Sequence, residues 1–336
     1  MSARRRKAPE QALFAFAEES GEKRRGMDEL FASLVAFQKA SRFLQLLTCM
    51  ARFSDYGPYN ALLAAVQRPN ATCVLPPSKW TKYNRELKRE ARPIVLLRPF
   101  APVFCVFDIA DTRVVRGRPD RLPSYLRSRV AETPASPVPE ATVRRLLARL
   151  PWWGILHEAL PTGPAAQGEI HLADGREGDL SVPVADGGVV PWRPVYVLRT
   201  RTDVPPTDLF AAVVRELARL FCHHLMCGYE KGWGDGRSLT PDVEAFEVEV
   251  ALWLVSRRIG VASPAYAAVD DYFATHPAIP ETMSMDAVVD AVGEIETMLG
   301  ECTLRDGSLF KTSHDFAARV RAGDVVHPFQ QEITTT

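Results

Sequence analysis

Leu209-Phe-Ala-Ala-Val-Val-Arg-Glu-Leu-Ala-Arg-Leu-Phe-Cys-His-His-Leu225 is the stretch around which the second half of the chain is organised. Its apolar side chains recur every three or four residues, at Leu209, Val213, Leu217 and Leu220. That spacing is the period of an amphipathic helix. A Pro-Pro pair at 205–206 breaks the preceding segment, and Thr207 and Asp208 offer N-capping side chains directly after it. The sequence therefore predicts one long helix with its apolar face turned to a core.

The middle of this helix reads Arg215-Glu216-Leu217-Ala218-Arg219, where a zinc peptidase would carry His-Glu-x-x-His. In that motif, residues i and i+4 share a helix face, so two imidazoles bind one metal beside a general-base Glu. Here Glu216 keeps the general-base position, but Arg215 and Arg219 replace the imidazoles. A guanidinium stays protonated near neutral pH and has no lone pair for a metal. The pattern indicates a zinc-peptidase helix without its metal ligands, in which Glu216 is vestigial.

The composition is that of an ordinary globular protein of 336 residues, with 46% hydrophobic and 24% charged residues. The 41 Lys and Arg balance the 41 Asp and Glu, so nucleic-acid binding must come from local charge. The sequence has no run of about 18 apolar residues, so it predicts no membrane span. The N-terminal residues lack the apolar core of a signal peptide. The six scattered cysteines form no Cys-x-x-Cys pair and fit buried thiols. We expect a cytoplasmic protein with no membrane partner.

We expect five segments along the chain. Residues 1–27 read as a flexible basic tail, with a nucleic-acid-binding arm as the alternative, and residues 28–132 as a first domain. Residues 133–150 combine a proline-rich linker with a short Arg-rich helix. A second domain covers 151–325, strand-like over 152–201 and helical after that, and 326–336 is a flexible tail.

Two features stand out in the first domain. Residues 94–99 and 103–108 read as the strands of a hairpin around a proline-containing turn. Before them, basic and aromatic side chains alternate, at Lys79, Trp80, Lys82, Tyr83, Arg85, Lys88, Arg89 and Arg92. Basic groups can follow phosphates while aromatic faces stack on unpaired bases, so this run is the candidate DNA-binding site. On a helix, Lys82, Arg85 and Arg89 would share one face. Neighbouring glutamates at 86 and 90 could pair with them, so a solvated, salt-bridged helix is the alternative.

The order of motifs over residues 50–112 resembles the N-terminal domain of ArdC-type antirestriction proteins. The matching positions are Asn60, Leu62, Leu63, Gln67, Pro69, Ala71, Thr72, Trp80, Arg85, Lys88, Ile94, Pro99, Val106, Phe107, Asp108 and Thr112. The resemblance implies single-stranded DNA binding by this domain, in mobile-element or antirestriction biology.

The second half resembles the metallopeptidase-like domain of ArdC relatives, a compact zincin of the ImmA/IrrE type. Residues 220–225 resemble the exit of the family's zinc helix, and 246–261 its second helix, which supplies the third ligand. Aligning Phe246-Glu-Val-Glu with the family's Phe-Glu-Ala-Glu puts Ala245 at the third-ligand position, with Glu244 and Glu247 as neighbouring alternatives. The resemblance therefore implies that all three metal ligands have been replaced.

Two hypotheses follow for the former metal site. In one, zinc has moved to ligands drawn from His223, His224, Cys227, Glu244 and Glu247, with His223 and Cys227 at i and i+4 of a helix. In the other, Arg215 and Arg219 pair with glutamates of the second helix, so that guanidinium groups replace the charge of the metal. We expect the second arrangement and hence no cofactor; zinc is expected only under the first.

The sequence thus predicts an α+β protein in which an ArdC N-terminal-like module precedes a mostly helical, zincin-like domain with a small sheet. The expected function is that of a catalytically inactive, metallopeptidase-like protein that binds single-stranded DNA. One alternative is an active zinc metallopeptidase with a displaced metal site. The other is a protein-interaction scaffold whose former peptidase cleft holds a protein partner.

Overall fold

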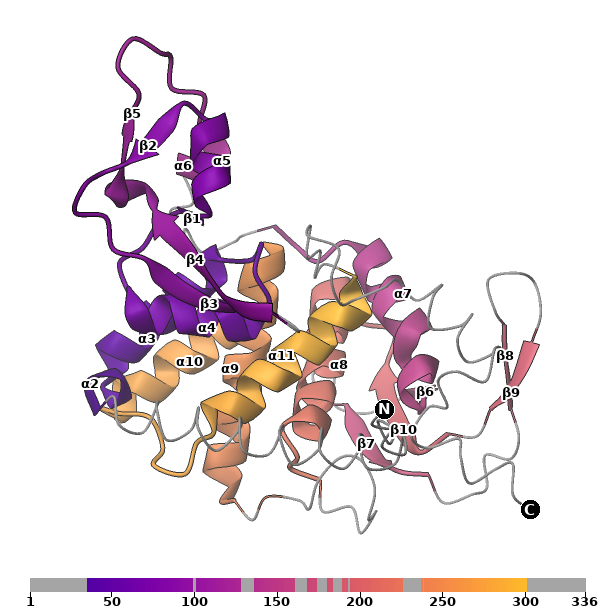
Figure 1. The fold of residues 1–336 in the computed structure, drawn as a ribbon. Coiled ribbons are helices and arrows are strands. Elements are labelled where there is room, and N and C mark those ends of the chain that lie inside the picture. The colour runs from indigo at the N-terminus through magenta and orange to yellow at the C-terminus, as the bar shows by residue number, and fades with distance from the viewer. Residues whose placement is uncertain are drawn as a thin grey trace, which may run out of the picture.

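The computed structural model describes residues 35–98, 101–127, 136–160, 168–173, 180–183, 189–192, 194–225, 237 and 239–300. The fold is α+β and mostly helical with small sheets, as the sequence predicts. Figure 1 shows a helical body with a small lobe at one end and a sheet at the other. None of the helices in the described ranges is both long and apolar enough to span a bilayer. The tails predicted at 1–27 and 326–336 lie outside these ranges.

The helical body packs its helices around one buried apolar core. Its members are α2 (Val35–Gln38), α3 (Ala40–Arg52), α4 (Pro58–Gln67), α7 (Glu140–Arg149), α8 (Pro206–Phe221), α9 (Pro241–Ile259), α10 (Ala265–Thr275) and α11 (Met285–Leu299). The short Arg-rich helix predicted after the linker is α7. Two of its guanidinium groups, from Arg145 and Arg149, donate to the last carbonyls of α11 and so satisfy that helix end.

The predicted central helix is α8, and the prediction of its apolar face is confirmed. Leu209, Val213 and Leu217 are buried against the neighbouring helices α9 and α11. The predicted N-cap is wrong, because the helix already begins at Pro206. Proline suits a first helical position, where its missing N–H would have no partner. The Thr207 hydroxyl instead accepts a hydrogen bond from the backbone N–H of Val138 at 3.1 Å.

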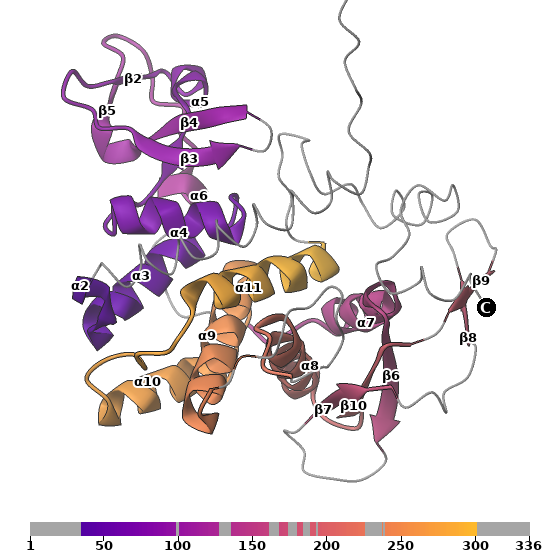
Figure 2. The same cartoon turned by 60° about the horizontal axis from the view of Figure 1, so that its bottom comes forward.

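A three-stranded sheet leads into α8. Its order is β6 (Ile155–Leu160), β10 (Tyr196–Arg201) and β7 (Glu169–Leu172), with β10 parallel to β6 and antiparallel to β7. A short 3-10 helix, η2 (Leu150–Trp153), precedes β6, and β8 (Leu180–Pro183) pairs with β9 (Val189–Trp192). The strands predicted over 152–201 are therefore present in the described ranges. In Figure 2, α8 lies beside β7 and β10, so the predicted central helix packs against this sheet.

The hairpin predicted in the first domain is confirmed as β3 (Ile94–Arg98) and β4 (Ala101–Asp108), which β1 (Val74–Leu75) extends at the β4 side. The inner face of the hairpin, with Ile94, Leu96 and Val106, is buried on the helical body. Two amide side chains of α4 cover the outer edge of β3. Asn60 both donates to and accepts from the backbone of Leu97, and Gln67 does the same with the backbone of Val95. The backbone groups at the edge of β3 are thus hydrogen-bonded by side chains in place of a neighbouring strand.

The lobe consists of residues 76–92 and 109–127. It contains α5 (Pro77–Lys82), β2 (Arg85–Leu87), the 3-10 helix η1 (Ile109–Asp111), β5 (Thr112–Val114) and α6 (Ser124–Arg127), with β2 paired to β5. The helix considered for residues 82–92 is wrong. After α5 the chain turns at Asn84, whose φ of 58° is left-handed, and continues as strand β2. Lys82, Arg85 and Arg89 therefore share no helix face.

One core spans the two predicted domains. The buried cluster runs from Phe37 on α2 to Leu299 on α11 and includes the inner face of the hairpin. A second, small cluster around Trp80 holds the lobe together. The Arg258 guanidinium on α9 forms a buried ion pair with Glu296 of α11. It also donates to the backbone carbonyls of Met50 and Tyr56. The two-domain division stays a prediction, but α3, α4 and the hairpin are packed on the second half.

Candidate functional site

Glu216, which is predicted to occupy a general-base position, is directed at the sheet. One of its oxygens accepts hydrogen bonds from the backbone N–H of Ile170 on β7 and from Arg219, both at 3.1 Å. Gly168 allows this approach, because a Cβ there would lie 2.9 Å from the Glu216 Cγ. Burial raises the pKa of Glu216, opposed by the nearby Arg219 and the Ile170 N–H. One carboxylate oxygen thus satisfies a backbone N–H at the edge of the sheet.

The two arginines of the motif take different partners. Arg215 spans to the second helix and forms a two-point pair with Glu249 of α9, at 2.6 and 3.3 Å. Arg219 pairs with Glu216 one turn back on its own helix. The expected guanidinium bridge between the helices is therefore formed by Arg215, while the described partner of Arg219 is intrahelical. A fixed cation and a carboxylate now connect α8 and α9.

The buried carboxylate of the second helix is Glu247, whose side chain is 0% exposed. Its oxygens accept from His224 Nε2 at 2.7 Å, from Arg237 at 2.6 and 2.9 Å, and from the backbone N–H of Ser284 at 2.6 Å. Burial alone would raise the pKa of Glu247, but the hydrogen bonds from His224 and Arg237 outweigh it and lower this pKa. Ala245, the predicted third-ligand position, is exposed, and Glu244 is half-buried.

Three possible metal ligands come together beyond the end of α8. Ligand atoms of Cys222, His224 and Glu247 lie within 4.8 Å of one another, and His224 Nδ1 is buried with no hydrogen-bond partner in the described ranges. These atoms fit a metal in composition. The predicted His223–Cys227 pair does not form on a helix, because α8 ends at Phe221 and His223 has a left-handed φ of 61°. Cys227 lies outside the described residues.

The charges around this cluster oppose a metal. Glu247 already has four donors, and the Arg237 guanidinium, which bonds to both of its oxygens, would repel a cation. Burial raises the pKa of Cys222 well above its ordinary value, and its thiol lies 3.7 Å from the Ala287 carbonyl. The arrangement is chemically a buried ion-pair network in which Arg237 supplies the positive charge.

Sequence reasoning groups Cys222 with His223, His224 and Cys227 by composition, but it missed Arg237 and Ser284 as partners of this network. Arg237 lies ten residues before Glu247, and Ser284 lies 37 after it, so no helical period connects them. The sequence signal that could have identified this partner is Arg237 itself, an arginine in the segment between the end of α8 and the start of α9. A buried glutamate needs such a cation, and an arginine in a nearby loop can supply it.

The proposed DNA-binding run divides into anchored and exposed side chains. Trp80 is fully buried and donates its indole N–H to the Phe107 carbonyl at 3.0 Å, so the prediction that it stacks on bases is wrong. Arg85 is held by Asp120 at 2.6 Å and by the Thr112 hydroxyl. Lys88 donates to the Ala110 carbonyl, and Tyr83 packs on the small cluster. The members that remain exposed are Lys79, Lys82, Arg89 and Arg92.

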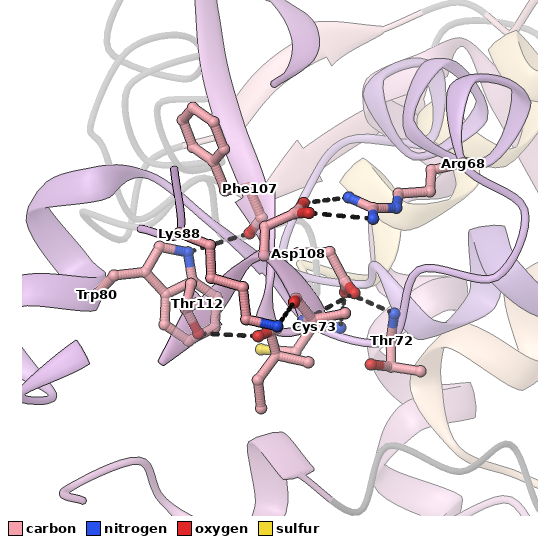
Figure 3. A network of polar contacts seen from close by, with 11 residues as sticks. Arg68, Thr72, Cys73, Trp80, Lys88, Phe107, Asp108 and Thr112 are labelled. Atoms are coloured by element: carbon pink, nitrogen blue, oxygen red, sulfur yellow. Dashed lines mark hydrogen bonds and ion pairs between the residues drawn. The ribbon is translucent and has the colours of Figure 1, made fainter. Parts of the chain in front are cut away.

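Several residues that carry the resemblance to ArdC-type proteins form a structural network (Figure 3). One oxygen of Asp108 accepts from the backbone N–H groups of Thr72 and Cys73, and the other caps η1 through Ala110. Arg68 pairs with Asp111 beside it. These contacts join the turn after α4 to the end of β4, so the network fixes the base of the lobe.

The lobe is strongly basic. Its sequence holds eleven Lys and Arg against four Asp and Glu. The exposed cations are Lys79, Lys82, Arg89, Arg92, Arg113, Arg116, Arg118 and Arg121. The exposed acids are Glu86, which pairs with Arg113, and Glu90. In a chain of zero net charge, this surface concentrates positive potential at one end of the molecule.

Comparisons with protein-family models, with curated proteins and with solved structures give no match for this chain.

Proposed function

We propose that this chain is a catalytically inactive, metallopeptidase-like protein of the cytoplasm that binds single-stranded DNA through the lobe. The observation that carries the proposal is the excess of exposed cations on the lobe of a neutral chain. A surface of this kind attracts polyanions by releasing their counterions. The resemblance to ArdC-type proteins is the reason to choose DNA, and alone suggests a mobile-element or antirestriction role.

The contacts of α8 support the lack of peptidase activity. Arg215 and Arg219 have no lone pair for zinc, and both guanidinium groups are bound to carboxylates. Glu216 bonds to the sheet edge and to Arg219. A zinc hydrolase needs three protein ligands and an open position for water. These side chains supply neither.

The test is a titration of a fluorescent single-stranded oligonucleotide at several salt concentrations. Arg116→Glu, Arg118→Glu and Arg121→Glu together should weaken binding at low salt by about tenfold or more and reduce the salt slope by roughly 2, because three phosphate contacts are lost. The matched control reverses two exposed cations outside the lobe, Arg42 and Arg144, and should leave affinity within about twofold of wild type. A wild-type protein that binds no oligonucleotide at low salt would overturn the proposal.

One observation favours the alternative of an active metallopeptidase, namely the proximity of Cys222, His224 and Glu247. Metal analysis of the purified protein separates the two functions. The inactive assignment expects well under one equivalent of zinc, in wild type and in Cys222→Ser alike. One equivalent in wild type that is lost in Cys222→Ser would establish a metal centre at this cluster instead.

A further inference from the structure

The outer face of the β3–β4 hairpin is aliphatic and exposed. Val95 and Leu97 on β3 are 37% and 43% exposed, and Val103 on β4 is 53% exposed. Val95 lies directly opposite Cys105, which is also exposed. Because side chains alternate along a strand, these four residues project from the same side of the hairpin. Apart from them, Val114 of the lobe is the other exposed large hydrophobic side chain in the described ranges.

This aliphatic face continues into the lobe. Phe107 follows Val103 and Cys105 on the same side of β4 and packs in the small cluster with Trp80. Figures 1 and 2 both place the hairpin between α4 and the lobe. The side chains of its inner face belong to the core of the helical body. The exposed cations Arg89 and Arg92 lie in the segment that enters β3.

The charge beside the aliphatic face selects its occupant. A second copy would bring two lobes, each with an excess of seven positive charges, close together, and their repulsion opposes it. A polyanion with apolar groups between its charges matches both parts of the surface. Single-stranded nucleic acid has this chemistry, because its unpaired bases present apolar faces between the phosphates. In a duplex the same faces are stacked within the helix and cannot reach an aliphatic surface.

We infer that the aliphatic face of Val95, Leu97, Val103 and Cys105 is the surface on which unpaired bases lie, while the cations of the lobe bind the phosphates. The inference rests on the proposed function and adds the part of the site that distinguishes single strands from duplexes. It also assigns the base contacts to aliphatic side chains, since Trp80 is buried and cannot make them.

The experiment compares four ligands of equal length: a thymidine oligonucleotide, the same backbone without bases, a duplex, and polyglutamate as competitor. Wild type should bind the thymidine strand about tenfold more tightly than the abasic strand or the duplex, with similar salt slopes for the two single strands. Val95→Ser with Val103→Ser should reduce thymidine binding to the abasic level and leave abasic binding unchanged. Val114→Ser, a valine with the same 37% exposure as Val95, is the matched control and should behave as wild type.

Each result separates this inference from the proposed function. Equal binding of thymidine and abasic strands by wild type would overturn the inference and leave DNA binding by the lobe intact. Equal losses in Val114→Ser and in the hairpin variant would also overturn it, because the effect would not be specific to the hairpin. Displacement of DNA by polyglutamate at equal charge concentration would show that the lobe cations accept any polyanion, and would overturn both the inference and the choice of DNA. No binding to any strand would remove both proposals.

Discussion

Two buried glutamates, Glu216 on α8 and Glu247 on α9, have pKa values shifted in opposite directions. Glu216 has one cation, Arg219, which is 40% exposed, and its pKa is raised mainly by burial. Glu247 is fully enclosed but has Arg237, His224 and a backbone N–H, which together lower its pKa despite burial. The Glu216 carboxylate therefore has less compensation from cations and hydrogen-bond donors than the Glu247 carboxylate. The charge that holds this region together lies at Glu247.

Glu216→Gln should stabilise the protein at neutral pH. A raised pKa in the folded state means that the folded protein loses stability as the pH rises from the ordinary carboxyl value of 4.5 through the raised value. Gln keeps an oxygen to accept from Ile170 and avoids this penalty. We expect a gain of roughly 1 kcal/mol at pH 7 that disappears below about pH 4, measured by urea unfolding at each pH. A loss of stability at pH 7 would show that the ion pair with Arg219 outweighs burial.

Glu247→Gln should be strongly destabilising, by about 3–5 kcal/mol at pH 7, because it leaves the Arg237 cation beside a neutral buried amide. The deficit should shrink as the pH falls through the lowered pKa of Glu247, since the wild-type carboxylate is then protonated too. Glu249→Gln is the matched control. It breaks the more exposed pair with Arg215 and should cost about 1 kcal/mol or less, as thermal unfolding would measure. Similar losses in both variants would contradict the central role of Glu247.

At the scale of elements, Gly168 directly before β7 lies too close to Glu216 of α8 to carry a side chain without a shift. Gly168→Ala should push Glu216 and Thr200 away from the strand edge, since the new Cβ would lie 2.9 and 3.2 Å from their carbons. We expect a loss of about 1–3 kcal/mol. Gly293→Ala on α11 meets nothing within 4 Å and should stabilise that helix by roughly 0.5–1 kcal/mol. Denaturant unfolding of both variants measures the difference, and a neutral Gly168→Ala would show that the strand can move.

The elements predicted well from sequence are those whose pattern is local. The alternation in residues 94–108 gives the hairpin, and the period of 209–220 gives α8. The segment after α5 was mistaken for helix because its charges have helical spacing, whereas the left-handed turn at Asn84 decides the strand. The site was less predictable because its contacts join residues that are far apart in the sequence. Glu247 receives its partners from a loop and from the start of α11, and the burial of Trp80 depends on a carbonyl 27 residues away.

For the whole molecule, Arg258 connects the first and second halves of the chain more directly than any motif in the sequence suggests. Arg258→Leu should cost about 3–5 kcal/mol, because it leaves Glu296 buried without its cation and removes the guanidinium hydrogen bonds to the carbonyls of Met50, Phe53 and Tyr56. Arg257→Leu is the adjacent control. It removes a partly exposed guanidinium stacked over Trp253 and should cost about 0.5–1 kcal/mol.

The Arg258→Leu prediction is tested by following denaturant unfolding with two probes and comparing the two transition curves. Tryptophan fluorescence and far-ultraviolet circular dichroism should fall together in wild type, as expected for one cooperative core. In Arg258→Leu both curves should shift to lower denaturant. Two separated transitions in wild type would mean that the continuous core does not make the halves cooperative.

The bond from Arg258 to the Met50 carbonyl joins residues 208 positions apart in the chain, and this has a consequence for synthesis. A ribosome adds about 5–20 residues per second, so α3 waits roughly 10–40 seconds before its partner has been made. During that time the apolar sides of α3 and α4 have no α9 or α11 to cover them. The nascent first half is therefore the species most in need of a chaperone, although the finished protein buries that surface.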